Sequence, residues 1–393
     1  MVTTERLTEE ILKLEQSPEN EARIEKWRSF LRTGKGIPIV VFAEESFWAA
    51  ALGYDLPTYY RDPELLLRVQ LMTKLYAFRK FQDWSILSRD ISLYFGTGFV
   101  QTLFGQRAVV GEMRPLSVDA SKPLVTKERD LGLLKCPDFY RSGLMPRAHK
   151  FYRKITKMTK GRLNVIFPQW LSGPWAVAWH LRGMLELMKD TIRNPALVHK
   201  LMRFAVNARV QWEEERIRFA GDIGASAFST PLLPSRSPRS EGTLGSDEVS
   251  CAFISPRAYD EFIFPYEKEL ASRYDRVYYH SCGQLTPILH KIRELPNLYK
   301  IEICRTGKTD LETAKRELPR DIILQLAMEP LGDVLLASRS KVEKVLQDLQ
   351  AKSDGSPIEI WLEGINYFSP LGVNGIEKKI RSWLTVANKV LRS

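Results

Sequence analysis

The sequence predicts an α/β fold, a single (β/α)8 TIM barrel with an N-terminal helical extension. Short apolar runs alternate with longer amphipathic stretches along most of the 393 residues, as expected for a parallel sheet covered by helices. Seven such runs are visible in the sequence, and an eighth would close a barrel. No glycine-rich phosphate-binding sequence follows the first run, which disfavours an open nucleotide-binding sheet.

Residues 1–36 are predicted to form the helical extension and residues 37–393 the barrel. The extension is rich in Glu, Lys, Arg and Leu up to about residue 33. The predicted strands are 37–42, 163–170, 226–233, 276–282, 298–304, 321–327 and 358–364. The eighth strand is expected at 97–105, TGFVQTLFG.

Two connecting segments have clear helix starts. Segments 194–221 and 338–352 each begin with a capping residue, Asn or Ser, that is followed by apolar residues at helical spacing. Residues 231–248, PLLPSRSPRSEGTLGSDE, are interpreted as a long polar loop after one strand. A barrel carries its lid or substrate loop at such a place.

Composition narrows the class of protein. Hydrophobic residues make up 44% and charged residues 27% of the chain, which is typical of a globular domain. Neither an uncharged apolar run of about 18 residues nor an apolar signal region near the start is found in the sequence, so we expect a cytoplasmic protein without a membrane partner. The net charge of +11 comes from basic residues mixed with acids and without a nucleic-acid motif. A solvated basic surface is therefore favoured over nucleic-acid binding.

The strongest local motif is VYYHSCGQL at residues 277–285. Val277, Tyr278 and Tyr279 favour a strand, and the glycine at 283 ends it. Residues two apart in a strand point to the same face, so His280 and Cys282 should project together. Imidazole nitrogen and thiolate sulfur are typical zinc ligands. With only four cysteines in the chain, free thiols or metal ligands are expected rather than a disulfide framework.

Other polar residues follow predicted strands, where a barrel places its reactive groups. They are Glu44, Glu45, Cys304, Glu329 and Glu363. Three of them have a plainer interpretation: Cys304 as an inert buried thiol, and Glu329 and Glu363 as loop caps. His180 lies in an apolar helical segment, GPWAVAWHLRG, where it would line a pocket or pack in the core.

Four segments resemble the uroporphyrinogen decarboxylase superfamily. They are 173–202, 254–270, 278–289 and 310–330, and the resemblance runs in consistent order from about residue 37 to residue 390. It implies a single (β/α)8 barrel. The decarboxylases of this family carry an arginine-rich segment near the first strand, where this chain has IPIVVFAEESFWAAALGY. Decarboxylation of uroporphyrinogen is therefore disfavoured.

The other branch of the family holds zinc methyltransferases, in which an H-x-C pair and a later cysteine bind the metal. His280 and Cys282 match the pair, but the later turn reads WLEGIN, with Glu363 in place of the cysteine. The resemblance implies zinc held by His280, Cys282 and Glu363, with Cys304 as the alternative third ligand. A ligand set richer in oxygen is a stronger Lewis acid, which suits polarisation of an ether oxygen.

The resemblance further implies a zinc-dependent demethylase or methyltransferase. It would move a methyl group between a small methylated substrate, possibly a methyl ether, and the cobalamin of a separate corrinoid protein. Glu329 or Asp247, the latter beside Glu248, would supply a proton. The residues expected to line the substrate site are Glu45, Phe47, Trp48, His180 and Arg305. A homodimer is possible, since dimers are common in the family.

Two alternatives stay open. A metal-free, decarboxylase-like lyase would grip carboxylates with Arg236, Arg239 and Arg305. A non-catalytic corrinoid- or tetrapyrrole-binding protein would explain the changed third ligand.

Overall fold

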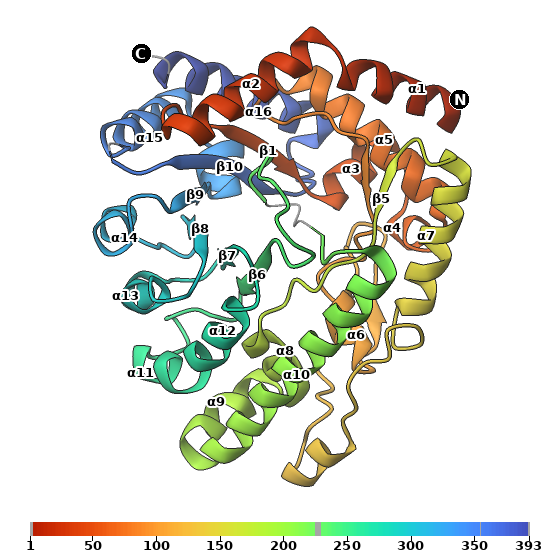
Figure 1. The fold of residues 1–393 in the computed structure, drawn as a ribbon. Coiled ribbons are helices and arrows are strands. Elements are labelled where there is room, and N and C mark those ends of the chain that lie inside the picture. The colour runs from red at the N-terminus through yellow and green to blue at the C-terminus, as the bar shows by residue number, and fades with distance from the viewer. Residues whose placement is uncertain (1–2, 225–228, 354, 392–393) are drawn as a thin grey trace.

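The computed structural model describes residues 3–224, 229–353 and 355–391 (Figure 1). Its main sheet is parallel and has six strands in the order β1-β10-β9-β8-β7-β6, and a second parallel pair joins β2 to β5. The strands of these two sheets are β1 (Ile39–Ala43), β2 (Asp90–Ser92), β5 (Asn164–Ile166), β6 (Gly242–Gly245), β7 (Val277–His280), β8 (Leu298–Cys304), β9 (Ile323–Ala327) and β10 (Ile358–Ile365). These eight parallel strands follow chain order, as in a (β/α)8 barrel. A small antiparallel pair, β3 (Ala108–Val109) and β4 (Ser117–Val118), lies outside them.

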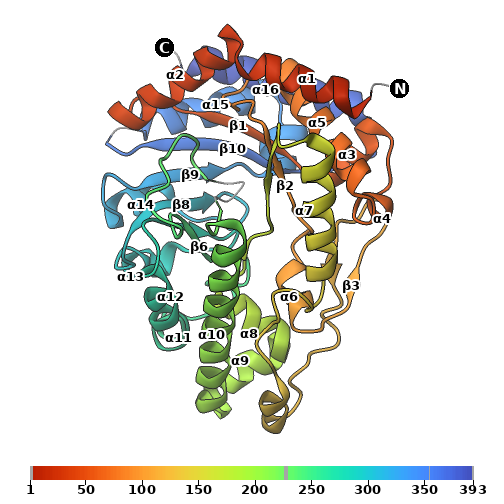
Figure 2. The same ribbon diagram turned by 45° about the vertical axis from the view of Figure 1, so that its right-hand side comes forward.

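Helices surround the strands (Figures 1 and 2). The longer ones are α1 (Thr4–Glu15), α2 (Pro18–Thr33), α3 (Glu45–Leu52), α5 (Pro63–Lys80), α7 (Met145–Thr159), α8 (Pro174–Arg182), α9 (Met184–Arg193), α10 (Pro195–Ala220), α12 (Phe264–Ala271), α15 (Arg339–Ala351) and α16 (Gly372–Val390). The shorter ones are α4 (Leu56–Tyr59), α6 (Phe99–Leu103), α11 (Pro256–Ala258), α13 (Leu289–Ile292), α14 (Leu311–Glu317) and the turns η1 (Glu128–Leu133), η2 (Tyr259–Ile263), η3 (Thr286–Ile288) and η4 (Pro330–Leu335). No helix in the described part of the chain is long and apolar enough to cross a bilayer.

Most predicted elements are confirmed because their local signals agree with their burial. β8 covers the predicted 298–304, and β1, β5, β7, β9 and β10 fall on the predicted runs. α10 begins after Asn194, whose side chain accepts the N–H of Leu197, and α15 begins after the predicted Ser338 cap. The fold class predicted from the sequence is therefore confirmed.

Two predicted strands are wrong or incomplete. Residues 97–105 contain helix α6, because Phe99, Val100 and Leu103 are buried on a helical turn; the missing strand is β2 instead. The prediction at 226–233 falls partly outside the described residues, and its described part, 229–233, forms turns. The strand beside β7 is β6, inside the segment interpreted as a polar loop. Its sequence, GTLG, contains one apolar residue, so no apolar run marks it.

Helix α2 packs against the starts of several strands, and Figure 2 shows α1 and α2 lying across the side of the molecule that carries β1 and α5. On α2, Trp27 and Phe30 are buried against Ile323 at the start of β9, with Val40 and Tyr299 from β1 and β8 beside them. The Trp27 indole also donates to the carbonyl oxygen of Trp84 at 2.7 Å. Because parallel strands start at this end, the opposite end is the open mouth at which barrel enzymes place their reactive groups.

The Ser338 cap can be tested by itself. Its hydroxyl oxygen accepts the backbone N–H of Lys341 at 3.2 Å at the start of α15. We expect Ser338→Ala to lower the free energy of unfolding by about 1 kcal/mol, because one N–H of the first turn loses its partner. Chemical denaturation followed by circular dichroism measures the change. The matched control is Ser382→Ala, an exposed position inside α16, where a change within about 0.5 kcal/mol is expected. Equal effects at both positions would contradict the capping role.

Candidate metal centre at the barrel mouth

His280 and Cys282 stand at the carboxyl end of β7, as predicted. His280 is the last strand residue, and Cys282 follows on the loop. Their ligand atoms share a small volume with a carboxylate of Asp247, all three within 4.8 Å of one another. The pair therefore faces the mouth together with a third possible ligand.

Asp247 reaches the pair from the end of β6. Its Oδ1 accepts the backbone N–H of Cys282 at 3.0 Å and lies 3.3 Å from Nε2 of His280. Burial at the mouth acts to raise the pKa of Asp247, but the hydrogen bond and the charge of His280 outweigh it, so that the pKa is lowered. The turn depends on Gly245, which has a φ of 70° and whose Cβ would lie 2.4 Å from the carbonyl oxygen of His280. Only glycine fits at this position, because any Cβ atom would collide with the backbone of His280.

The neighbouring strand β8 adds Glu302 and Cys304. Glu302 is fully buried, and its Oε1 accepts the Cys282 thiol at 3.7 Å while its other oxygen forms a short ion pair with Nδ1 of His280. Cys282 also donates its thiol proton to Cys304, which raises the pKa of Cys282 and lowers that of Cys304. The ligand atoms of Cys282, Glu302 and Cys304 lie within 4.8 Å of one another.

Glu363 completes the group from the end of β10. Its Oε2 accepts the side-chain amide of Gln325 at 3.4 Å, and its carboxyl group hydrogen-bonds to Glu302. Burial, followed by the charge of Glu302, raises the pKa of Glu363 well above its usual value. Burial acts to lower the pKa of His280, but the neighbouring carboxylates of Glu302 and Asp247 raise it well above its usual value. Two carboxyl groups in such contact require either a shared proton or a cation.

We name these six residues, Asp247, His280, Cys282, Glu302, Cys304 and Glu363, the mouth cluster. Zinc ligand atoms about 2.0–2.3 Å from the ion lie within about 4 Å of one another. Nε2 of His280 and Oδ1 of Asp247, 3.3 Å apart, and Sγ of Cys282 and Oε1 of Glu302, 3.7 Å apart, have this spacing. Nitrogen, sulfur and oxygen donors are the set that zinc prefers. The residues therefore fit zinc, with both predicted third ligands, Glu363 and Cys304, beside the pair.

Glu302 is the member that the sequence analysis missed. A signal was available: LYKIEIC places a charged residue two positions before Cys304 in an apolar strand. The same two-residue rule that joined His280 to Cys282 puts Glu302 and Cys304 on one face of β8. A carboxylate in a buried strand is rare without a partner.

A second imidazole lies beside the mouth cluster. Nε2 of His180, on α8, is 3.0 Å from Oε1 of Glu248, the residue after Asp247. Its Nδ1 is buried without a hydrogen-bond partner in the described part of the chain. The structure therefore brings His180 to the mouth, where the sequence analysis predicted a substrate-binding residue.

Two predicted substrate residues pack elsewhere. Phe47 is fully buried in the core, with its ring 5.0 Å from Trp48 in a T-shaped contact. The Trp48 indole donates to Ala43 O at 2.8 Å and meets Tyr76 of α5 edge-on. Both rings therefore pack α3 against the barrel, which is the more common role of aromatic side chains. Glu45, which precedes them, does reach the mouth.

Arg305 and Glu329 sit on the rim with their charges already engaged. Nε of Arg305 donates to Asp333 at 2.5 Å. The carboxylate of Glu329 accepts the backbone N–H groups of Leu331 and Gly332, and thereby caps η4. These two hydrogen bonds occupy the carboxylate of Glu329, which the sequence analysis predicted as a proton donor. The other predicted donor, Asp247, lies inside the mouth cluster.

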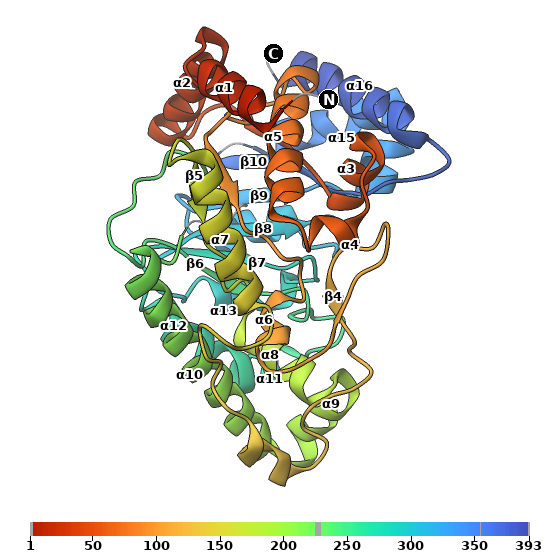
Figure 3. The same ribbon diagram turned by 90° about the vertical axis from the view of Figure 1, so that its right-hand side faces the viewer.

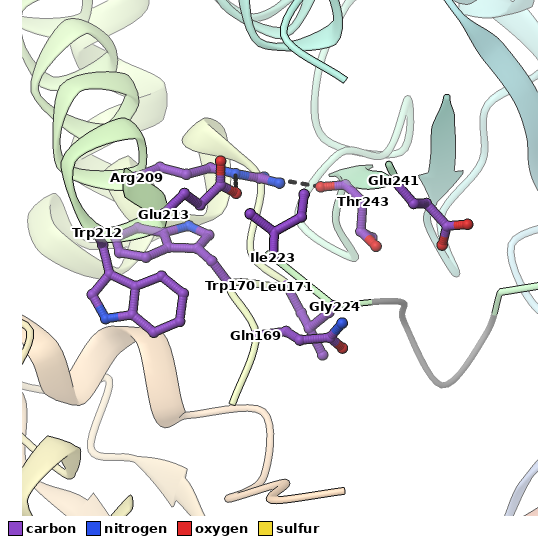
Figure 4. Close-up of a pocket in the computed structure, with 10 residues that line it drawn as sticks. All are labelled: Gln169, Trp170, Leu171, Arg209, Trp212, Glu213, Ile223, Gly224, Glu241 and Thr243. Atoms are coloured by element: carbon purple, nitrogen blue, oxygen red, sulfur yellow. Dashed lines mark hydrogen bonds and ion pairs between the residues drawn. The ribbon is translucent and has the colours of Figure 1, made fainter. Parts of the chain in front are cut away.

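A small cavity lies away from the mouth, between α10 and the end of the segment after β5 (Figure 4). It holds about one water molecule and is lined by residues that include the buried Arg209–Glu213 ion pair, 2.8 Å between Nε and Oε1. Arg209 also donates to the carbonyl oxygen of Thr243 on β6 at 2.9 Å. These contacts tie α10 to the barrel wall, a structural role.

Part of the chain and its overall fold are similar to known proteins. Residues 244–358, which contain five of the six cluster members, match the family model described as uroporphyrinogen decarboxylase (URO-D). Among solved structures, a methyltransferase from Methanosarcina mazei superposes with a TM-score of 0.62 at 15% identity, over 90% of this chain and 94% of that chain. No curated protein matches the chain. Residues 244–358 are thus similar to the uroporphyrinogen decarboxylase family, and the chain as a whole shares its fold with that methyltransferase.

Proposed function

We propose that this protein is a zinc-dependent methyltransferase that moves a methyl group between a small methylated substrate and the cobalamin of a corrinoid protein. The observation that carries the proposal is the convergence of His280, Cys282 and Cys304 with two carboxyl groups at the barrel mouth. The methyltransferase of similar fold supports the reaction class.

The residues of the mouth cluster divide the work. His280, Cys282 and Glu363 or Cys304 would hold zinc, which acts when bound as a Lewis acid on a substrate heteroatom. Glu302 fixes the imidazole through Nδ1, so that Nε2 faces the mouth. Asp247 orients the same ring and the loop of Cys282 through two contacts of its Oδ1. Because a thiol or an imidazolium group binds metal only after losing its proton, and His280 has a raised pKa, zinc binding should release protons.

The decarboxylase-like alternative is favoured by the name of the family model, but the charges at the mouth oppose it. Arg236 and Arg239 precede β6 and so lie at the opposite end of the barrel from the mouth. Arg239 is paired with Glu214, and Arg305 with Asp333. The carboxylate of Asp247, which has a lowered pKa, repels a polycarboxylate at the rim instead of gripping it.

Methyl transfer to free cob(I)alamin tests the proposal. Three methyl donors of different class serve as probes: methoxybenzene, tetramethylammonium and dimethyl sulfide. We expect the zinc-loaded protein to transfer methyl from at least one of them, followed by the absorbance change of the corrinoid. Cys282→Ala should lower this rate more than about 100-fold, because a metal ligand matters more than the outer partners, which are worth 10–100-fold.

The matched control is Cys136→Ala, a half-buried cysteine outside the mouth cluster, and it should keep the rate. Decarboxylation of uroporphyrinogen by the metal-free protein would contradict the proposal and support the lyase. Absence of transfer from every donor, with zinc bound, would contradict the reaction but leave the metal site intact.

A further inference from the structure

We infer that Glu44 and Glu45 form the proton donor of this site and that the substrate is a neutral methyl ether; this inference rests on the proposed function. The two residues follow β1 and begin α3. Their carboxyl groups hydrogen-bond to each other, which requires a proton between them. Such a pair stores one transferable proton in the mouth of the barrel.

The hydrogen bonds around the Glu44–Glu45 pair hold it in place, and the proton shared by the two carboxyl groups stays available for transfer. Glu44 is the N-cap residue of α3, yet its side chain makes no capping hydrogen bond, in contrast to Glu329. Its backbone N–H donates to Ile365 O at 3.0 Å, and its carboxyl group accepts the N–H of Gly364. Glu45 accepts the Tyr60 hydroxyl at 3.1 Å. The pair is thus anchored to β10 and to the residue after α4.

One peptide unit joins this pair to the mouth cluster. Gly364, with φ of 67°, directs its N–H to Glu44, while the preceding Glu363 turns its carboxyl group to Glu302, His280 and Cys304. The turn at 364 thus separates two faces of the end of β10. Figure 3 shows α5 in front of the strands of the main sheet, with α3 beside it. The acid pair and the cluster are thus attached to consecutive residues at the end of β10, so we place the bound substrate between them.

Tyr94 links the two centres from another side. Burial raises the pKa of its phenol, followed by the charges of Glu45, Glu44 and Asp247. A phenol that senses all three carboxyl groups lies near both the acid pair and Asp247 of the cluster. The phenols of Tyr54, Tyr59 and Tyr60 also lie around Glu45. Because the pKa values of these tyrosines are raised, their phenols keep their protons. The proton shared by Glu44 and Glu45 is therefore the one that can be transferred.

The electrostatics agree with a donor that is protonated at neutral pH. Burial, then the charge of Glu45, raises the pKa of Glu44 to about 8. Asp247, the earlier candidate, accepts hydrogen bonds from His280 and Cys282 and so serves as an acceptor. Glu44 therefore replaces Asp247 and Glu329 as the group able to give a proton.

Methyl transfer from an ether uses one proton. The methyl–oxygen bond breaks, the methyl carbon takes an electron pair from a Co(I) corrinoid, and the leaving oxygen takes the proton of the Glu44–Glu45 pair. An ether oxygen leaves as an alkoxide or phenoxide, so it gains from protonation. A tetraalkylammonium leaves as a neutral amine and gains nothing from an acid. A protonated acid pair therefore indicates an ether substrate.

Two aromatic ethers of different leaving ability test this assignment: methoxybenzene, which needs an acid, and 4-nitroanisole, whose phenolate leaves unaided. With free cob(I)alamin as acceptor, Glu44→Gln should lower kcat/KM at least about 100-fold for methoxybenzene and less than about 10-fold for 4-nitroanisole. The ratio of the two cancels any loss of folded protein. Zinc content should stay unchanged. Glu312→Gln, an exposed glutamate on α14, is the matched control and should leave both rates unchanged.

The pH profile gives a second readout. A proton donor acts below its pKa, so kcat/KM for methoxybenzene should fall as pH rises through about 8, and this fall should vanish in Glu44→Gln. Equal losses for both ethers, or no loss, would overturn the donor role while the proposed function stands. Transfer from tetramethylammonium alone would overturn the ether assignment. Absence of transfer by the wild-type protein from any donor would overturn both proposals.

Discussion

Replacing Cys282 by alanine is expected to weaken zinc binding more than about 100-fold. Cys282 belongs to both ligand triads of the mouth cluster, so its loss breaks each of them at once. Outer partners of a metal ligand are worth about 10–100-fold in affinity, and a direct ligand should exceed that range. Competition with a chromophoric chelator measures the affinity.

The zinc affinities of Cys304→Ala and Glu363→Gln then show which of the two residues is the third ligand. The larger loss identifies the direct ligand, and the smaller one a group that supports it. Cys136→Ala removes a thiol outside the cluster and should leave the affinity unchanged. If Cys282→Ala bound zinc as tightly as the wild-type protein, the H-x-C pair would be a packing feature and the metal assignment would be wrong.

Replacing Lys300 by methionine is expected to destabilise the fold by about 3–5 kcal/mol. Below the mouth cluster, Nζ of Lys300 lies 2.7 Å from Oε2 of Glu359, and both side chains are fully buried. Glu359 also accepts hydrogen bonds from Thr230 and the Trp361 indole. Without the ammonium group its carboxylate would be left with these neutral donors in the barrel interior, which costs far more than the pair itself contributes.

Urea unfolding followed by circular dichroism measures this loss. Lys352→Met is the matched control, because Lys352 pairs with Asp348 at 3.0 Å on the surface of α15. Exposed pairs four residues apart contribute about 0.3–0.5 kcal/mol, so the control should change little. A loss below about 1 kcal/mol in Lys300→Met would mean that water reaches the pair.

The sequence predicts the elements whose local signals are strong. β8 and α10 were placed correctly because an apolar β-branched run and an Asn cap mark them. β2 and β6 were missed because their strands are short and nearly free of apolar residues. Their place in the barrel is fixed by pairing with β5 and β7, a tertiary effect that no local pattern contains.

The candidate site divides in the same way. The two-residue spacing of a strand predicted the shared face of His280 and Cys282, and the same rule applied to β8 would have found Glu302. The meeting of Glu44 with Gly364 depends on the neighbours β1 and β10, which lie at opposite ends of the chain. Closure of the barrel alone brings these two together. The packing of Phe47 likewise depends on helices that the sequence does not place.

Zinc K-edge X-ray absorption of the purified, zinc-loaded chain tests the central claim most directly. We expect sulfur at about 2.3 Å together with nitrogen or oxygen at about 2.0–2.2 Å, and fewer sulfur neighbours in Cys282→Ala. This result would establish the H-x-C pair as a zinc centre at the mouth of the barrel. A spectrum with only nitrogen and oxygen neighbours, unchanged in the variant, would contradict it.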